Sequence, residues 1–174
     1  MINYKNLETI KEGHISDTVD FAVALANEML LTREEKKSLE IAAAFHDIGK
    51  VLIPAEYLNK NGALNQYERK IVNLHAVLGY EIMKSLGYSI QIAEAVRDHH
   101  NPNSKSQLAQ ILRMADIYSA MTEERPYKAA RSHEEAMSVL RKCKFTQEML
   151  EIGDRVLKLR RAKLNAQKKP VMAA

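Results

Sequence analysis

The sequence has one cysteine, no tryptophan, six glycines and four prolines among its 174 residues. The single thiol, Cys143, excludes an internal disulfide and a zinc site built from several cysteines, and it fits a reducing compartment. Scarce glycine and proline favour helices over a turn-rich β fold. Because no run of about 18 apolar residues is present, we expect no membrane span. Residues 1–14 contain no apolar signal-peptide core, so we expect a cytoplasmic protein.

Hydrophobic residues make up 46% and charged residues 28% of the chain, as is ordinary for one soluble globular domain. The net charge is +4, and seven basic residues without an acid lie between Arg155 and Lys169. We therefore expect a domain over residues 1–150, followed at 151–174 by a helix end and a basic tail. No aromatic residue is interleaved in that tail for base stacking, so we do not expect nucleic acid as a partner.

Apolar residues at helical spacing predict an all-α domain, a bundle of about seven helices. Capping pairs mark three helix starts, at Thr32 with Glu35, Asn65 with Glu68, and Ser132 with Glu135. The expected helices cover residues 3–30, 33–46, 66–86, 90–100 and 107–122, with a short one after Pro54 and two more after Ser132 and Thr146. The third of these should turn inward Ile71, Leu74, Leu78, Ile82 and Met83.

The stretch His46-Asp47-Ile48-Gly49-Lys50 ends an apolar helical run and places two potential metal ligands side by side. They are followed by Gly49, which lets the chain turn, and by Lys50. This pair alone leaves two interpretations open. His46 and Asp47 could hold a metal, or His46 could be an ordinary imidazole near the negative end of a helix dipole.

Other residues elsewhere in the chain favour the metal interpretation. The chain has six histidines, of which five lie on or at the end of an apolar helix: His14, His46, His75, His99 and His100. Asp116 lies in the middle of an apolar helix face, where an unpaired carboxylate is costly. A single inward histidine is usually an ordinary core residue, but one metal centre explains all of these residues together.

The ligand types predict the chemistry of such a centre. Imidazole and carboxylate ligands with open positions suit Fe, Mn, Co or Ni better than a closed tetrahedral zinc. The number of ligands suggests two divalent ions. Two such ions beside two aspartates leave the site with a net positive charge, which favours binding of a phosphate. A water between the ions loses its proton near neutral pH and becomes the nucleophile. Lys50 can then neutralise phosphate oxygens, so Asp47 and Lys50 are the candidate catalytic residues.

The order and spacing of these motifs resemble the HD-domain metal-dependent phosphohydrolases, and most closely the HD-GYP type, known for cyclic di-GMP hydrolysis. The matching positions are His14 with Val19, residues 46–51, Ile53-Pro54, residues 60–64, Glu68, His75 with Gly79, His99-His100, residues 111–121 and residues 125–128. The resemblance implies a helical bundle with a central metal site. It also implies a first ion held by His14, His46, Asp47 and Asp116, and a second held by Asp47, His75, His99 and His100.

The sequence departs from that family at the loop after His100. Residues 101–106 replace the longer loop that ends in Gly-Tyr-Pro. Ile10 stands where members with three metals have a glutamate, which indicates two ions, and Asp17 replaces a common arginine. We expect a phosphorylated nucleotide as substrate, first cyclic di-GMP or a related cyclic dinucleotide, and second a nucleoside monophosphate.

Lys50, Asn101 and Arg125 are the candidate substrate-binding residues. Asn101 before a proline is also ordinary turn chemistry, and Arg125 could pin a loop through an ion pair. The alternative to an enzyme is a catalytically silent metal-binding module that binds nucleotide or protein partners. The sequence leaves a homodimer open.

Overall fold

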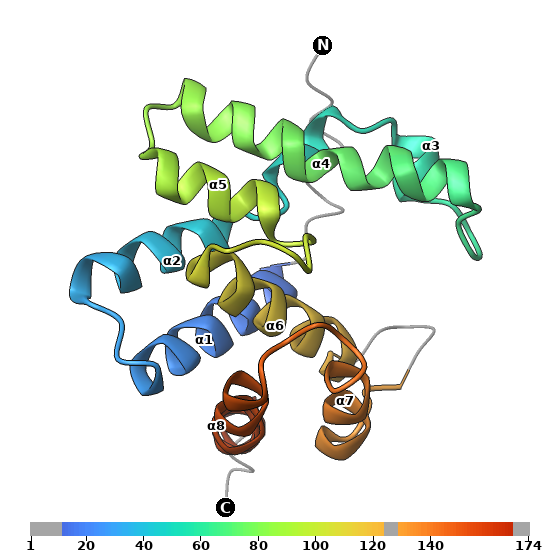
Figure 1. Ribbon diagram of the computed structural model, residues 1–174. Helices are drawn as coiled ribbons and strands as arrows, with labels where there is room; N and C mark the ends of the chain where they lie inside the picture. Colours follow the sequence, from blue (N-terminus) through green and yellow to red (C-terminus); the bar gives the residue numbers. More distant parts are fainter. Residues whose placement is uncertain (1–11, 124–128, 169–174) are drawn as a thin grey trace, which may run out of the picture.

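The computed structural model describes residues 12–123 and 129–168, and expectations about residues 1–11, 124–128 and 169–174 lie outside this part of the chain. Every regular element in the described part is helical, which confirms the expected all-α fold. The elements are α1 (Glu12–Glu28), α2 (Arg33–Phe45), the 3-10 helix η2 (Ile48–Leu52), α3 (Ala55–Leu58), α4 (Gln66–Ser85), α5 (Ile90–Asp98), α6 (Gln107–Thr122), α7 (His133–Leu140) and α8 (Gln147–Lys168). The short α3 is the helix expected after Pro54 (Figure 1).

Local capping fixes where three of the helices begin. At the start of α2, the backbone amide of Glu35 donates to the Thr32 hydroxyl at 3.2 Å, and the Thr32 amide donates to the Glu35 carboxylate at 2.8 Å. Asn65 opens α4 and Ser132 opens α7 through the same reciprocal pairing with a glutamate. These bonds satisfy amides that have no partner within the helix, and they confirm the three predicted starts.

Two glycines adopt backbone angles that favour glycine, and a third glycine has another role. Gly87 after α4 has a φ of 80°, and Gly62 in the loop before α4 has a φ of 111°. Both angles lie in the left-handed region that favours glycine. Gly49, which we expected to let the chain turn, lies inside η2 without a positive φ. Its role is a close approach to α4, described with the site below.

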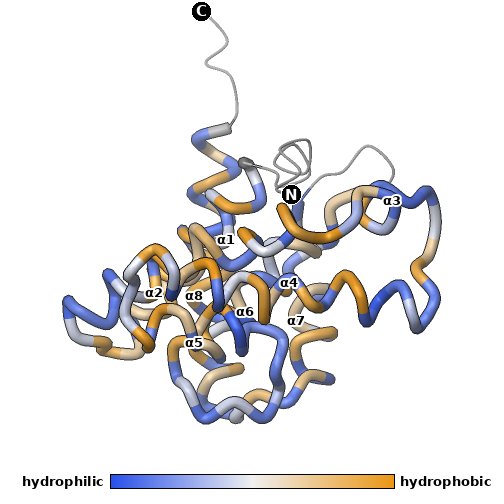
Figure 2. The backbone as a smooth tube through the Cα atoms, turned by 90° about the horizontal axis from the view of Figure 1, so that it is seen from above, coloured by the Kyte–Doolittle hydropathy of each residue, from blue (hydrophilic) through white to orange (hydrophobic). Residues whose placement is uncertain are grey.

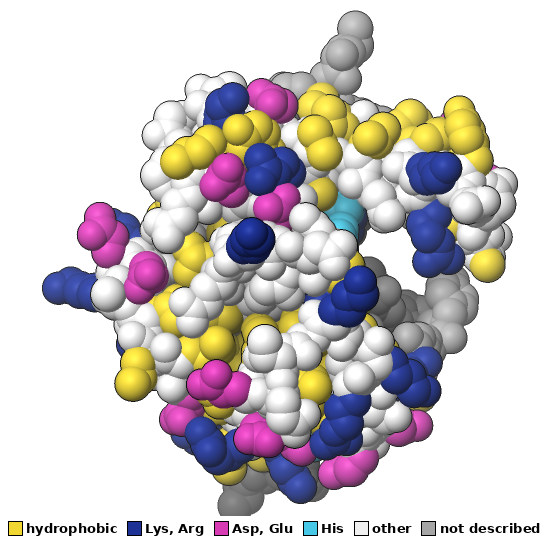
Figure 3. All heavy atoms as spheres, viewed as in Figure 1, with side chains coloured by type: hydrophobic (Ala, Val, Ile, Leu, Met, Phe, Trp, Pro, Cys, Tyr) yellow, Lys and Arg dark blue, Asp and Glu magenta, His cyan; other side chains and the backbone are white. Residues whose placement is uncertain are grey.

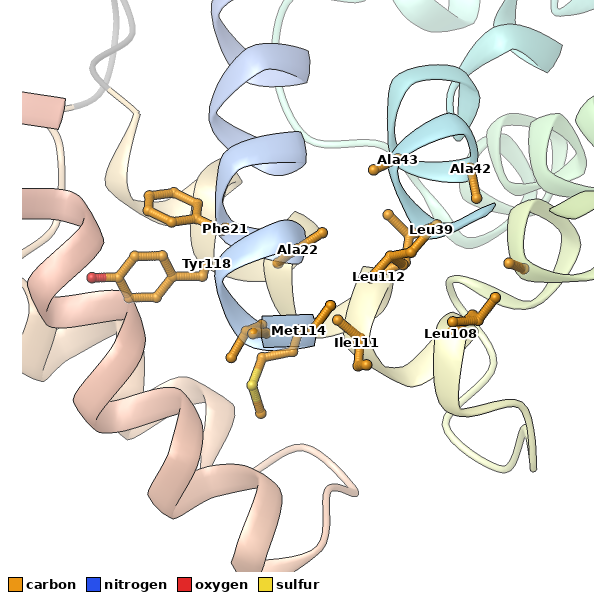
Figure 4. Close-up of a cluster of buried hydrophobic side chains, with 14 of the residues drawn as sticks. Phe21, Ala22, Leu39, Ala42, Ala43, Leu108, Ile111, Leu112, Met114 and Tyr118 are labelled. Carbon is orange, nitrogen blue, oxygen red and sulfur yellow. The ribbon is translucent and has the colours of Figure 1, made fainter. Parts of the chain in front are cut away.

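Helix α6 lies in the centre of the bundle and packs against α1, α2, α5 and α7 (Figure 1). Its side chains Ile111, Leu112 and Met114 are fully buried. The ring of Phe21 from α1 meets the ring of Tyr118 edge-on, with the centroids 4.9 Å apart (Figure 4). A helix buried in this way is rigid, so any polar side chain that it carries is held in place.

Helix α4 is rotated from the orientation that we expected. Of the predicted inward set, Met83 is buried, Ile71, Leu78 and Ile82 are half-buried, and Leu74 is 52% exposed. The buried residues besides Met83 are His75, Ala76 and Gly79. Small side chains let α5 and η2 approach the backbone of α4, and this close packing sets the rotation of the helix. The expectation that Leu74 points inward was wrong. The close packing of small residues, and not the size of the apolar side chains, determines which face of α4 is buried.

Helix α8 continues past residue 150 without a break. It packs against α1 and buries Val156, Leu157 and Leu164 in the common core. The expected boundary between a domain and a tail falls inside this helix and stays a prediction. Figure 2 shows hydrophobic residues recurring along the helices, with hydrophilic ones between them and in the loops. No described helix has the length and apolar character that crossing a membrane requires.

Basic residues of α8 lie against acidic residues of its neighbours. Arg155 pairs with Glu28 at 2.9 Å, and Arg160 pairs with Asp20 of α1 at 2.5 Å. These ion pairs neutralise part of the positive charge of α8 within the protein itself. The expectation that nucleic acid is not a partner stays a prediction.

Candidate metal centre

The histidines and acids expected to bind metal come from separate helices and meet in one region. His14 lies in the first turn of α1, and Asp116 lies in the last two turns of α6. His46 and Asp47 follow α2 directly, His99 and His100 follow α5, and His75 lies in the middle of α4. Of the seven, Asp116 is half-buried, His100 is exposed and the other five are buried. Figure 3 shows a histidine side chain at the surface beneath α4, beside a hollow.

Three of these residues form a group that we call the His14 cluster: His14, His46 and Asp116. One ligand atom from each lies within 4.8 Å of the others. The Nε2 of His14 is 3.1 Å from Oδ1 of Asp116, and the Nε2 of His46 is 3.7 Å from the same oxygen. These separations leave the three atoms facing a shared space of the size that a metal ion fills.

A second group, which we call the His75 cluster, consists of His75, His99 and His100. The Nε2 of His75 lies 3.3 Å from the Nε2 of His99 and 3.3 Å from that of His100. All three ligand atoms again lie within 4.8 Å of one another. The structure therefore separates the six residues into two groups of three.

Asp47 lies between the two clusters and turns one carboxylate oxygen to each. Its Oδ2 is 3.5 Å from the Nε2 of His46, and its Oδ1 is 3.3 Å from the Nε2 of His75. A carboxylate placed in this way can bind one cation on each side.

The backbone determines which ring nitrogen of the histidines is free. The Nδ1 atoms of His46, His75 and His99 lie 2.6–2.7 Å from the carbonyl oxygens of Ala43, Val72 and Val96, each three residues earlier. A carbonyl oxygen only accepts, so each Nδ1 carries a hydrogen and donates it. In the neutral ring Nε2 then carries a lone pair, the form that binds metal.

Two observations show that these residues fit a cation. The Nε2 lone pairs of neutral His75 and His99 face each other at 3.3 Å, where they repel unless a positive charge lies between them. The buried Nε2 of His46 has no hydrogen-bond partner in the described part of the chain. A buried polar atom without a partner is costly, and a bound ion would remove that cost. The two clusters can therefore hold metal.

The protonation of the site also suits cation binding. Burial opposes ionisation of Asp47, but the imidazole of His46 and the ammonium of Lys50 outweigh it, so the pKa of Asp47 lies well below its ordinary value. The pKa of Asp116 is lowered in the same way, against burial, by its close contact with His14 and by nearby imidazoles. Burial lowers the pKa of His75 to about 4. At neutral pH the acids are charged and His75 is neutral, which are the forms that bind metal.

The three predicted substrate-binding residues have different surroundings. The Nζ of Lys50 lies 2.6 Å from Oδ2 of Asp47, at the edge of the site, and its side chain is 23% exposed. Asn101 follows His100, and its side-chain oxygen accepts a hydrogen bond from the amide of Asn103 at 3.0 Å, which is ordinary turn chemistry. Arg125 lies outside the described residues. A contact of any of them with substrate stays a prediction.

Sequence reasoning missed Ser119, which contacts His14. The Oγ of Ser119 lies 3.0 Å from Nδ1 of His14 and donates to the backbone oxygen of His14 at 3.3 Å. Because the hydroxyl hydrogen is used in that way, the lone pairs of Ser119 are available to accept from Nδ1–H. The signal in the sequence is its position three residues after Asp116, on the same side of α6.

The sixth histidine, His133, lies away from both clusters. Its Nδ1 is 2.8 Å from the Tyr118 hydroxyl and its Nε2 is 2.7 Å from Oδ1 of Asp154. It therefore joins α6, α7 and α8, and it was not among the predicted ligands.

Two glycines set the distance between η2 and α4, and with it the distance between Asp47 and His75. A β-carbon at Gly49 would lie 2.0 Å from the backbone oxygen of His75 and 2.6 Å from the backbone nitrogen of Gly79. Only glycine permits this contact between two backbones.

Comparisons with known proteins agree with this fold. A family model described as the HD domain matches residues 4–146. The 3'3'-cGAMP-specific phosphodiesterase 1 of Vibrio cholerae is 30% identical over 141 residues, which cover 74% of this chain and 32% of that protein. The cyclic di-GMP phosphodiesterase response regulator RpfG of Xanthomonas campestris is 31% identical over 130 residues, which cover 67% of this chain and 34% of RpfG.

Among solved structures, the HD domain of the L. monocytogenes phosphodiesterase PgpH superimposes with a TM-score of 0.65 at 18% identity, covering 96% of this chain and 100% of that one. A second structure of that domain is a complex with cyclic-di-AMP, and its TM-score is 0.64 at the same 18% identity. At this identity the likeness shows the fold. The chain spans about a third of the length of the curated relatives described above. Family model, fold and the arrangement of histidines and aspartates agree, and the chain belongs to the HD-domain family.

Proposed function

We propose that this chain is a metal-dependent phosphodiesterase that cleaves a phosphodiester bond of a nucleotide. The observation that carries the proposal is the position of Asp47, whose two carboxylate oxygens face the two clusters separately. A carboxylate shared in this way suits a pair of cations, the arrangement that many phosphate-cleaving enzymes use. The named activities of the relatives from V. cholerae and X. campestris support the same reaction class.

Each residue of the site has a role in this proposal. The His14 cluster with Asp47 would hold one divalent ion, and the His75 cluster with Asp47 would hold the other. When bound, the ions supply a nucleophile from water and positive charge for the phosphate oxygens. Lys50 orients Asp47 through their 2.6 Å contact and adds positive charge at the partly open edge where a phosphate would enter. Mixed imidazole and carboxylate ligands favour Fe, Mn, Co or Ni over Zn.

A cyclic dinucleotide is the first candidate substrate. The relatives are named for cyclic di-GMP and 3'3'-cGAMP, and the PgpH HD domain was solved with cyclic-di-AMP. The loop after His100, residues 101–106, is folded on itself, because the side chain of Gln110 donates to the backbone oxygens of Asn101 and Ser104 at 3.1 Å. A loop this short leaves the exposed His100 edge open to a bulky ligand. A nucleoside monophosphate is the second candidate.

The test is a panel of cyclic di-GMP, 3'3'-cGAMP, cyclic di-AMP and nucleoside monophosphates, assayed with anaerobically purified protein loaded with manganese or ferrous iron. We expect two ions per chain and cleavage of at least one cyclic dinucleotide. Two bound ions with nucleotide binding but no cleavage would instead support the silent binding module. Cleavage of monophosphates alone would replace the phosphodiesterase by a nucleotidase.

Removing the Ser119 hydroxyl should weaken one ion site and leave the other intact. Ser119→Ala takes away the acceptor for Nδ1–H of His14, so the ring is no longer held with Nε2 toward Asp116. Loss of such a supporting bond typically costs about 10–100-fold in metal affinity. Titration calorimetry with manganese should therefore show that the affinity for one of the two ions falls by about that factor.

Two further variants separate positioning from packing. Ser119→Thr keeps the hydroxyl, so both metal affinities should stay at the level of the unaltered chain. Ser38→Ala removes another buried serine, on α2, and should also leave both affinities unchanged. Equal weakening of both ions, or no rescue by threonine, would contradict a role specific to His14.

A further inference from the structure

The outer face of α4, opposite the buried His75, carries apolar residues that the described part of the chain leaves uncovered. Tyr67 is 68% exposed, Leu74 is 52% exposed and Val77 is 50% exposed. Three of the eight large hydrophobic residues exposed in the described part thus lie on one helix. Figure 3 shows hydrophobic side chains gathered along the upper edge of the molecule, over α4.

These residues form one stripe with three charged ones. The stripe consists of Tyr67, Lys70, Leu74, Val77, Glu81 and Lys84, spaced alternately by three and four residues. That spacing keeps the side chains on one side of a helix and is the repeat through which two helices pack side by side. We call this set the α4 stripe.

The charges of the α4 stripe make it complementary to itself in one orientation only. Lys70 and Glu81 are equally distant along the helix, in opposite directions, from the midpoint between Leu74 and Val77. When two copies of α4 lie antiparallel about that midpoint, Lys70 of each copy meets Glu81 of the other, and Leu74 meets Val77. In a parallel pair, Lys70 would meet Lys70 and Glu81 would meet Glu81, which is repulsive.

We propose that the α4 stripe is a homodimer interface, in which α4 packs antiparallel against α4 of a second copy about a two-fold axis. In a two-fold interface every contact between two different residues occurs twice. If the first residue of one copy contacts the second residue of its partner, then the second residue of that copy contacts the first residue of the partner. The α4 stripe meets this requirement, with an apolar centre and charged flanks, the usual composition of such an interface. Among the described residues of one copy, the ion pair of Glu81 is a 3.9 Å contact with Lys84 in which both side chains are well exposed, so the Glu81 carboxylate is available to a partner.

The dimer would lie on the opposite side of α4 from the metal centre. His75 faces inward from the same helix, so the interface and the site share α4 without sharing a surface. The proposal does not depend on the catalytic one, because association is measured without substrate.

Charge reversal tests the proposal in sedimentation velocity of the whole chain at low ionic strength, over a wide range of concentrations. We expect a monomer–dimer equilibrium for the unaltered chain. Lys70→Glu alone and Glu81→Lys alone should each raise the dissociation constant about tenfold, because two attractive contacts become repulsive. The double variant Lys70→Glu/Glu81→Lys should restore the original constant.

Arg69→Glu is the matched control, since it makes the same change of charge at an exposed position of α4 outside the stripe, and it should leave association unchanged. Circular dichroism and metal content check that all variants keep the fold. A chain that stays monomeric at every concentration would show that something else covers this face and would overturn the proposal. A double variant as weak as the single ones would overturn the antiparallel pairing.

Discussion

Asp47→Asn is expected to lower phosphodiester hydrolysis by about a thousandfold or more, with little change of fold. Asparagine has nearly the same shape as aspartate, but it lacks the negative charge that would be shared between the clusters. The oxygens of Asp47 lie 3.5 Å from His46 Nε2 and 3.3 Å from His75 Nε2, so the substitution affects both ion positions at once. We expect the metal content to fall from two ions per chain to one or none, measured by elemental analysis beside the hydrolysis assay.

The matched control for this variant is Asp154→Asn. Asp154 also bonds a buried histidine, His133, at 2.7 Å, but it lies in the contact between α7 and α8. The same chemical change there should leave hydrolysis and metal content nearly unaltered. If Asp47→Asn kept two ions and most of its activity, Asp47 would not be the shared ligand.

The second large effect is expected from a single methyl group. Gly49→Ala should lower the free energy of unfolding of the metal-free protein by about 3 kcal/mol or more. The added carbon would lie 2.0 Å from the backbone oxygen of His75, and backbone cannot rotate away as a side chain can. Relief of the clash must move η2 away from α4, so the contact between Asp47 and His75 should be lost with the stability. Urea denaturation and metal titration measure the two effects separately.

Gly13→Ala provides the comparison, because a β-carbon at Gly13 meets nothing within 4 Å. Because alanine has a higher helix propensity than glycine, this variant should be as stable as the unaltered chain or slightly more stable. A Gly49→Ala protein as stable as Gly13→Ala would show that η2 and α4 are not held together by this contact.

What could be predicted from the sequence depended on how local the determining contacts are. Thr32 and Glu35 lie three residues apart, so the start of α2 could be read from the sequence directly. The clustering of residues such as His14, His46 and Asp116 was expected from polar side chains on apolar helix faces and from a family motif, although the contacts between them join residues distant in sequence. The rotation of α4 was missed, since the packing of Gly79 against Gly49 determines it, not the apolar residue Leu74.

The partner of His14 could not be predicted for a similar reason. Ser119 is 105 residues from His14 in the sequence, and their contact depends on the position of α6 along the axis of α1. No local pattern records that offset. The position of Ser119 three residues after Asp116 indicates a shared helix face, but it does not indicate which neighbouring side chain lies opposite.

The imidazoles of the site are anchored in two ways, and these have different tolerance to mutation. His46, His75 and His99 are held by main-chain oxygens of Ala43, Val72 and Val96, which every amino acid supplies. Side chains at those three positions can therefore drift during evolution, within the limits of packing, without releasing the rings. His14 is held by a side chain, so among descendants of this sequence we expect position 119 to retain a hydrogen-bond acceptor while positions 43, 72 and 96 vary.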